Sequence, residues 1–194
     1  HTRADLVVCF GTDATNYPEF FRRCAPAADS GLQRRTVFVG TVPPAQAIEG
    51  SSVETVTAQG DLFDTAATLA ALVEQRRVSQ PTPELAELAE AVRGARYAVL
   101  VWEPAQLPAH GALIGETLLR IVMSLNRSTR AGMFALGGLD GAQTANAAMT
   151  WLSGLPLRSR VGPRGLEHQP LQYATGRLLA GDEVDLLLWV ASFG

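Results

Sequence analysis

The sequence predicts an α/β fold, with a Rossmann-like, mostly parallel sheet flanked by helices and arranged as one domain or as two similar lobes. Short runs rich in valine, leucine and phenylalanine recur along the chain, with segments of helical periodicity between many of them. These runs are almost continuously apolar instead of alternating with polar residues, which is typical of parallel strands buried on both faces.

The expected elements follow from these runs. We expect strands at residues 5–10, 36–39, 53–57, 97–102, 132–136 and 184–190. Helices are expected at residues 62–76, 83–92, 113–126, 143–152 and 170–179, each with apolar residues at helical spacing. Leu69, Leu72 and Val73 form one such stripe, which indicates a helix packed on a sheet.

The segment 79–83 separates two of these helices. Its prolines disfavour helix before them, and Pro83 suits a first helical turn. Within the fragment 1–194 we therefore place a lobe boundary near residues 78–96. Residues 4–11 and 184–191 resemble each other, since both carry an early acid and continue into an apolar run, as in a doubled architecture.

Composition excludes several kinds of partner. A net charge of -3 and a pI near 5.6 give no reason to expect nucleic acid or an anionic membrane, and no apolar run is long enough to cross a bilayer. Two cysteines and three histidines form neither a disulfide framework nor a zinc pattern. Without a signal-type start the chain is expected to be cytoplasmic, and its core-type ends suggest further sequence on both sides.

The loop after the first strand is the main candidate for a cofactor site. The candidate residues are Gly11, Thr12 and Asp13, because a glycine at the start of this loop would let a phosphate approach the backbone. Asp13 and Glu19 place negative charge there, however, and no arginine or lysine lies between Gly11 and Arg22. The interpretation we favour is that Asp13 or Thr15 caps a helix, and that any cofactor contact at Gly11 to Asp13 is vestigial.

The other loops show weaker signs of a cofactor or catalytic site. Residues 40–44 lack the acid or arginine of a dinucleotide site, and the glycine-rich segment 137–141 predicts a tight turn. His1, His110 and His168 are far apart, and no nucleophile elbow occurs. We therefore predict no catalytic residue and no metal ligand.

The order of the segments resembles the B-type subunit of the formylmethanofuran dehydrogenase family, a relative of the molybdopterin oxidoreductases. The resemblance covers nearly the whole chain and is carried by residues 4–11 (ADLVVCFG) with Tyr17-Pro18, 96–101 (RYAVLV) with 124–126 (SLN), 151–157 (WLSGLPL), 164–170 and 181–185. The family cofactor that this resemblance implies is a tungsten or molybdenum pterin guanine dinucleotide.

The chain departs from this family in the cofactor loops. It has Asp13-Ala14 for Asn-Pro and Tyr17-Pro18-Glu19 for His-Pro-Arg, and Gly40 and Val42 replace an acid and an arginine. The family's Ser-Arg-Gly motif is only partly matched at residues 162–165, which are Gly-Pro-Arg-Gly. Losing several charge-assisted hydrogen bonds, each worth about 1.5–3 kcal/mol, would abolish dinucleotide binding, so no cofactor is expected in this fragment.

This loss of cofactor residues resembles the branch of the family whose members are subunits of formyltransferase/hydrolase complexes in methylotrophic bacteria. The resemblance implies a non-redox, structural B-type subunit, not itself catalytic, in tetrahydromethanopterin- and methanofuran-linked one-carbon (formaldehyde oxidation) metabolism. Its implied partners are an amidohydrolase (the A-type subunit), a formyltransferase subunit and a C-type subunit.

Two alternatives remain open. A catalytic dehydrogenase subunit would bind the metal pterin through further residues outside this fragment. An unrelated Rossmann-like small-molecule binder would instead hold a ligand near residues 137–141 and have no stable partner.

Overall fold

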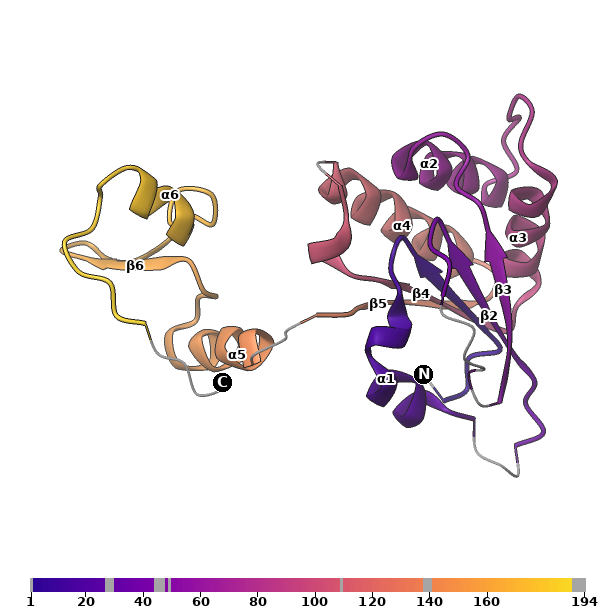
Figure 1. Ribbon diagram of the computed structural model, residues 1–194, viewed down its shortest axis with the longest axis horizontal. Coiled ribbons are helices and arrows are strands. Elements are labelled where there is room, and N and C mark those ends of the chain that lie inside the picture. Colours follow the sequence, from indigo (N-terminus) through magenta and orange to yellow (C-terminus); the bar gives the residue numbers. More distant parts are fainter. Residues whose placement is uncertain are drawn as a thin grey trace. The chain divides into compact units, whose positions relative to one another are not determined.

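The computed structural model describes residues 2–26, 30–43, 48, 50–108, 110–137 and 141–189. The chain forms two compact units, His1–Leu136 and Gly137–Gly194 (Figure 1). Residues 78–96, expected to hold a lobe boundary, lie inside the first unit. No helix of the described residues is long and apolar enough to cross a membrane.

The first unit is built on a five-stranded sheet in the order β3-β2-β1-β4-β5. Its strands are β1 (Leu6–Phe10), β2 (Arg34–Val39), β3 (Ser51–Val56), β4 (Tyr97–Trp102) and β5 (Arg130–Ala135). Every neighbouring pair is parallel, so the predicted α/β sheet is confirmed. The predicted bounds of these strands differ from the observed ones by at most two residues.

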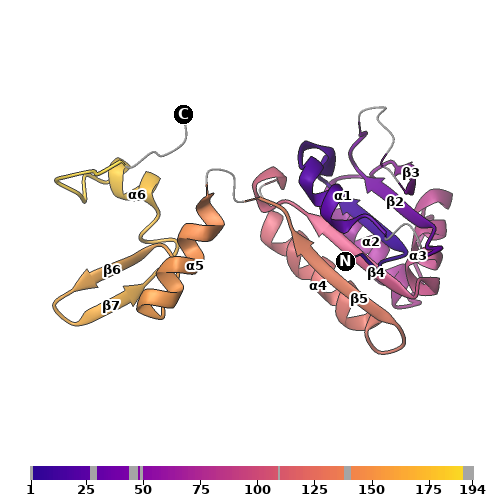
Figure 2. The same ribbon diagram turned by 90° about the horizontal axis from the view of Figure 1, so that it is seen from below.

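Helices cover both faces of this sheet (Figures 1 and 2). They are η1 (Ala14–Asn16), α1 (Pro18–Cys24), α2 (Leu62–Val73), α3 (Pro83–Gly94), η2 (Pro104–Gln106) and α4 (Gly111–Leu125). Asp61 caps α2 by accepting a hydrogen bond from the Asp64 amide at 2.7 Å. The helix ends before the predicted residue 76 because Gln75 adopts a left-handed φ of 58°.

The core has two layers, one on each face of the sheet. Leu6, Val8 and Phe10 of β1 belong to the larger layer beneath α2, α3 and α4. Val7 and Cys9 belong to the smaller layer beneath α1. All five side chains are between 0% and 3% exposed, which is the burial expected of a central parallel strand.

The second unit contains α5 (Ala142–Ser153), β6 (Ser159–Gly162), β7 (Gly165–His168) and α6 (Thr175–Ala180). Strands β6 and β7 form an antiparallel hairpin that the sequence did not predict. Tyr173 is the one buried residue in the described part of this unit. The described residues of the second unit form no parallel sheet and do not repeat the first unit.

Two predictions in the second unit are wrong. Residues 184–189 form no strand, and Val190 lies outside the described residues. The helix predicted at 170–179 is reduced to α6, because residues 170–173 form a turn. The apolar run 184–189 has no strand beside it in the described part of this unit, and its large apolar side chains are between 41% and 85% exposed.

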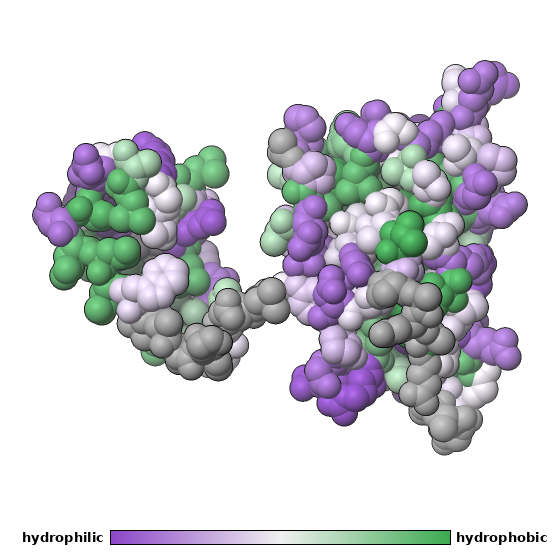
Figure 3. Space-filling view, in the orientation of Figure 1, coloured by the Kyte–Doolittle hydropathy of each residue, from purple (hydrophilic) through white to green (hydrophobic). Residues whose placement is uncertain are grey.

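Apolar side chains also gather on the visible surface of the second unit (Figure 3). The most exposed of the large ones, each at 78% or more, are Trp151, Leu152, Val161, Leu171, Leu186, Leu188 and Trp189. Because only one of its described residues is buried and this much apolar surface is exposed, the described part of the unit gains little free energy from burial by itself.

Candidate functional site

The candidate site lies where the strand order of the first unit reverses. From β1 the chain continues to β2 and β3 on one side, while β4 and β5 lie on the other. In open α/β sheets, ligands bind beyond the carboxyl ends of the strands at such a point. The loop after β1 holds Gly11, Thr12 and Asp13, and the loop after β4 begins with Glu103.

A leucine side chain covers the glycines of this crevice. Gly11 and Gly40 follow β1 and β2 with φ values of 61° and 69°. A β-carbon added at Gly11 would lie 2.3 Å from Cδ2 of Leu62, and one added at Gly40 would lie 2.9 Å from its Cδ1. The close approach that glycine offers a phosphate in a dinucleotide site is thus taken by the apolar side chain that opens α2.

A buried carboxylate joins the two loops. Glu103 is 5% exposed, and its Oε1 accepts a 2.7 Å hydrogen bond from the Tyr17 hydroxyl. Its Oε2 accepts a longer, 3.3 Å hydrogen bond from the buried Thr12 hydroxyl. Thr12 therefore holds an internal partner, and both oxygens of the carboxylate are satisfied by the protein.

This carboxylate changes the acidity of Tyr17. The hydrogen bond to Glu103, then burial, then the negative charge of Glu103 raise the pKa of Tyr17 to about 12. Each of these effects favours the neutral phenol over the phenolate. Tyr17 consequently remains a hydrogen-bond donor at physiological pH and cannot act as a base there.

Asp13 has a local structural role. Its Oδ1 accepts hydrogen bonds from the backbone amide and the hydroxyl of Thr15, at 3.0 and 2.5 Å, and so caps η1. The sequence predicted a cap at Asp13 or Thr15, and the structure places it at Asp13. Burial, and then the charge of Asp13, raise the pKa of the Cys9 thiol far above its usual range, so that Cys9 stays an unreactive thiol.

The described loops of the crevice contain no arginine or lysine that would neutralise an anion. Loops 11–17, 40–43 and 57–61 and the described part of loop 103–110 contain Asp13, Asp61 and Glu103, and their one histidine is His110. A pyrophosphate there would meet negative charge at low dielectric, where repulsion is strong. Among the described residues, no group of three or more acidic, histidine or cysteine side chains could hold a metal ion.

The remaining sequence candidates are placed elsewhere. His110 precedes α4 and makes no side-chain cap, while the His168 ring lies 3.3 Å from the Ser159 hydroxyl across the β6–β7 hairpin. Residues 162–165, which only partly match the family's Ser-Arg-Gly motif, form the turn of that hairpin. In the predicted turn 137–141, Gly138, Leu139 and Asp140 lie outside the described residues.

Sequence reasoning missed two residues that define the crevice. Glu103 carries a recognisable signal, because it is an acid placed directly after a doubly buried strand. Leu62 carries none, since its position over Gly11 and Gly40 depends on how α2 packs on the sheet.

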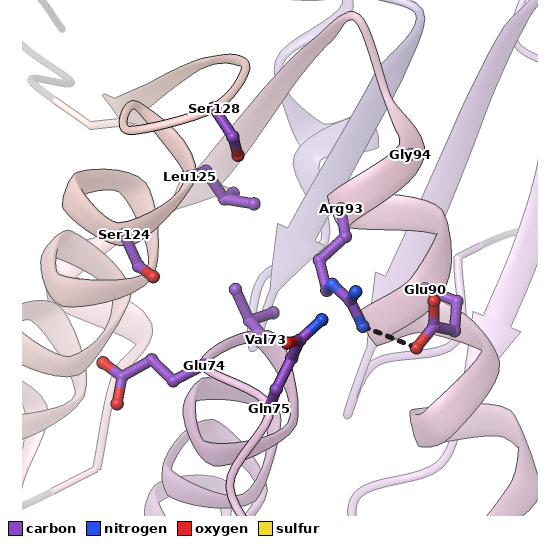
Figure 4. A pocket seen from close by; sticks show the side chains of 9 residues that line it. All are labelled: Val73, Glu74, Gln75, Glu90, Arg93, Gly94, Ser124, Leu125 and Ser128. Atoms are coloured by element: carbon purple, nitrogen blue, oxygen red, sulfur yellow. Dashed lines mark hydrogen bonds and ion pairs between the residues drawn. The ribbon is translucent and has the colours of Figure 1, made fainter.

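A cavity of about 480 Å³ lies at the other end of the sheet, between the carboxyl ends of α2, α3 and α4 (Figure 4). Its charges are already paired. Arg93 donates a 2.8 Å hydrogen bond to Glu90, and Glu74 pairs with Arg76 and Arg120. We assign no chemistry to this cavity because it presents no uncompensated charged group.

The chain is similar to a curated protein and to a chain of a solved structure, while no family model matches it. The chain is 31% identical over 107 residues to the B-type subunit of the formyltransferase/hydrolase complex Fhc of Methylorubrum extorquens, which is 55% of this chain and 29% of that protein. It is also similar to a chain in the crystal structure of the formyltransferase/hydrolase complex FhcABCD from Methylorubrum extorquens with methylofuran. That match has a TM-score of 0.82 and 26% identity, and covers 99% of this chain and 53% of the other.

These matches support the expected likeness to the B-type subunit of a formyltransferase/hydrolase complex. They give no support to the wider dehydrogenase assignment or to its pterin cofactor. The chain spans 29% of the curated relative and about half, 53%, of the solved one.

Proposed function

We propose that this chain is part of a non-redox, structural subunit of a formyltransferase/hydrolase complex in one-carbon metabolism. The subunit would hold together an amidohydrolase subunit, a formyltransferase subunit and a further subunit that work on a tetrahydromethanopterin- and methanofuran-linked formyl group. The chain would have no activity of its own and would act in the cytoplasm. The similarity to the B-type subunit and to a chain of the solved complex from Methylorubrum extorquens supports this proposal.

The observation that carries the proposal is the filled, acidic crevice at the strand-order reversal. Leu62 packs against Gly11 and Gly40, and the buried Glu103 takes the hydroxyl of Thr12. A guanine dinucleotide would have to displace this leucine and place its phosphates beside carboxylates. A fold that keeps its core but fills its cofactor crevice fits a structural role better than a redox role.

The surface of the second unit supports a role in assembly. Large exposed apolar patches on soluble proteins commonly mark contact sites with other proteins. Trp151 and Leu152 at the carboxyl end of α5 are 90% and 87% exposed, and aromatic residues are enriched in protein interfaces.

Purification of the tagged natural protein from its native cells, under mild conditions, tests the proposal. We expect an amidohydrolase and a formyltransferase subunit to copurify in fixed ratio, identified by mass. Elemental analysis of the same sample should show neither tungsten nor molybdenum in stoichiometric amount. Stoichiometric metal with a pterin dinucleotide would establish the redox alternative, and a protein that purifies alone would exclude the assembly role.

A matched pair of variants sharpens this experiment. Trp151→Glu should abolish or strongly reduce copurification, because a charge would be buried at the proposed contact. Val42→Glu, at a similarly exposed position of the first unit (83%), should leave copurification unchanged. Equal yields of partner subunits with wild type and Trp151→Glu would argue against assembly through this surface.

A further inference from the structure

The arginines of the first unit are gathered at the edge of the sheet opposite the crevice. The chain contains 16 arginines and no lysine. Arg3 precedes β1, Arg34 opens β2, Arg96 precedes β4 and Arg130 opens β5, so four of the five parallel strands begin beside a guanidinium. Helix dipoles do not account for these four residues, because they belong to strands and not to the last turns of helices.

A pocket of about 420 Å³ lies at this edge. It is lined by Thr2, Arg3, Ser30, Leu32 and Arg96. Small-molecule sites commonly have volumes of about 300–1,000 Å³, so the pocket has room for a small molecule or a short peptide segment. The two charged side chains that line the pocket, Arg3 and Arg96, are both cationic.

The positive charge of this pocket is compensated only in part. No carboxylate of the described residues lies within ion-pair distance of Arg3. Arg96 is 83% exposed at its side chain and forms a long ion pair with Asp5, whose carboxylate lies 3.7 Å from its Nε. The Asp5 carboxylate also accepts the backbone amides of Arg96 and Tyr97, at 2.9 and 2.8 Å.

The backbone around the pocket is held in place. The buried Arg34 donates to the carbonyl oxygens of Ala4 and Cys24, at 3.0 and 2.6 Å, which ties the segment before β1 to the end of α1. On the other wall, the Leu32 amide donates to the Ser30 hydroxyl at 3.3 Å. These bonds fix the positions from which the two cationic side chains extend.

We propose that this pocket binds a compact anionic group, a carboxylate or a phosphate, between the guanidinium groups of Arg3 and Arg96. A guanidinium presents planar pairs of N–H donors that match both anions, and the Thr2 hydroxyl adds a further donor. Half-buried Leu32 gives the pocket an apolar wall, which suits an anion attached to a carbon skeleton. This proposal does not depend on the proposed function.

Calorimetric titration of the chain at low ionic strength, where surface charge is least screened, tests it. The probes are inorganic phosphate, citrate and a triglutamate peptide. We expect saturable binding that Arg3→Gln and Arg96→Gln each weaken about tenfold, the loss expected for one charge-assisted hydrogen bond. Arg177→Gln removes an exposed charge from the second unit and should leave the affinity within about twofold of wild type.

The order of the affinities separates the sources of the anion. Binding tighter for triglutamate than for citrate would identify an acidic polypeptide segment as the ligand, and the reverse order a small free anion. Thermal unfolding of each variant verifies that the fold is kept. The proposal is overturned if no probe binds saturably, or if Arg177→Gln weakens binding as much as Arg3→Gln and Arg96→Gln do.

Discussion

Two segments of similar sequence differ in their structure: residues 6–10 form a buried strand, whereas residues 184–189 form no strand. Residues 6–10, in β1, are between 0% and 3% exposed, with β2 and β4 beside them and helices on both faces. The large apolar residues of 184–189 are between 41% and 85% exposed, with no strand beside them in the described part of their unit. An apolar run therefore predicts a strand only where neighbouring strands are available to pair with it.

Matched leucine truncations test this comparison most strongly. Leu6→Ala removes a 3% exposed side chain from β1 and should lower the free energy of unfolding by about 2–5 kcal/mol. Leu188→Ala removes an 82% exposed side chain and should change it by less than about 0.5 kcal/mol. Urea denaturation of the isolated chain, followed by circular dichroism, measures both. Equal losses would mean that residues 184–189 are buried in solution.

The loop that follows β1 should be almost as sensitive. Gly11→Ala would bring a β-carbon to 2.3 Å from Leu62 and force alanine to a φ of 61°, for a loss of about 1–3 kcal/mol. Gly31→Ala is the control, since Gly31 has a φ of 60° but no atom within 4 Å of an added β-carbon. The double change Gly11→Ala with Leu62→Ala should relieve the steric part. If the two glycine variants lose the same stability, Leu62 does not fill the crevice.

The hydrogen bond between the two crevice loops should contribute less. Tyr17→Phe removes the donor to Glu103 and should cost about 1–2 kcal/mol, because a buried carboxylate loses its closer partner. Tyr173→Phe removes the comparable 3.0 Å hydrogen bond to Glu167 in the second unit, which has little core to lose. Thermal unfolding of the two variants should rank Tyr17→Phe as the more damaging, and the opposite ranking would contradict the comparison.

The smallest expected effect is a dependence on alkaline pH. The pKa of Tyr17 is raised in the folded protein from 10.0 to about 12, so folding favours the protonated phenol. Its stabilising contribution is complete below about pH 10 and is lost as the pH rises through 12. The difference in stability between wild type and Tyr17→Phe should therefore shrink between pH 9 and 12. A difference that grows over this range would have the wrong sign.

The sequence predicted the parallel sheet well because burial on both faces leaves continuous apolar runs. It predicted the cap at Asp13 because that interaction reaches only two residues along the chain. Glu103 lies 91 residues from Thr12, and no local pattern records that they meet. The hairpin of β6 and β7 was missed because its strands have four residues each and are largely exposed, so apolar periodicity was absent. The strand at 184–190 was wrongly predicted because periodicity reports apolarity and not the presence of a pairing partner.

We propose that the crevice at the end of β1 does not accept an anionic dinucleotide. The most direct test of this claim is a titration of the chain with a guanine-bearing pterin dinucleotide, observed through the backbone amide resonances of Gly11, Thr12 and Asp13. We predict no saturable change in these resonances at any concentration that leaves the protein folded. Saturable shifts confined to these three amides would show that the crevice still binds the cofactor and would contradict the claim.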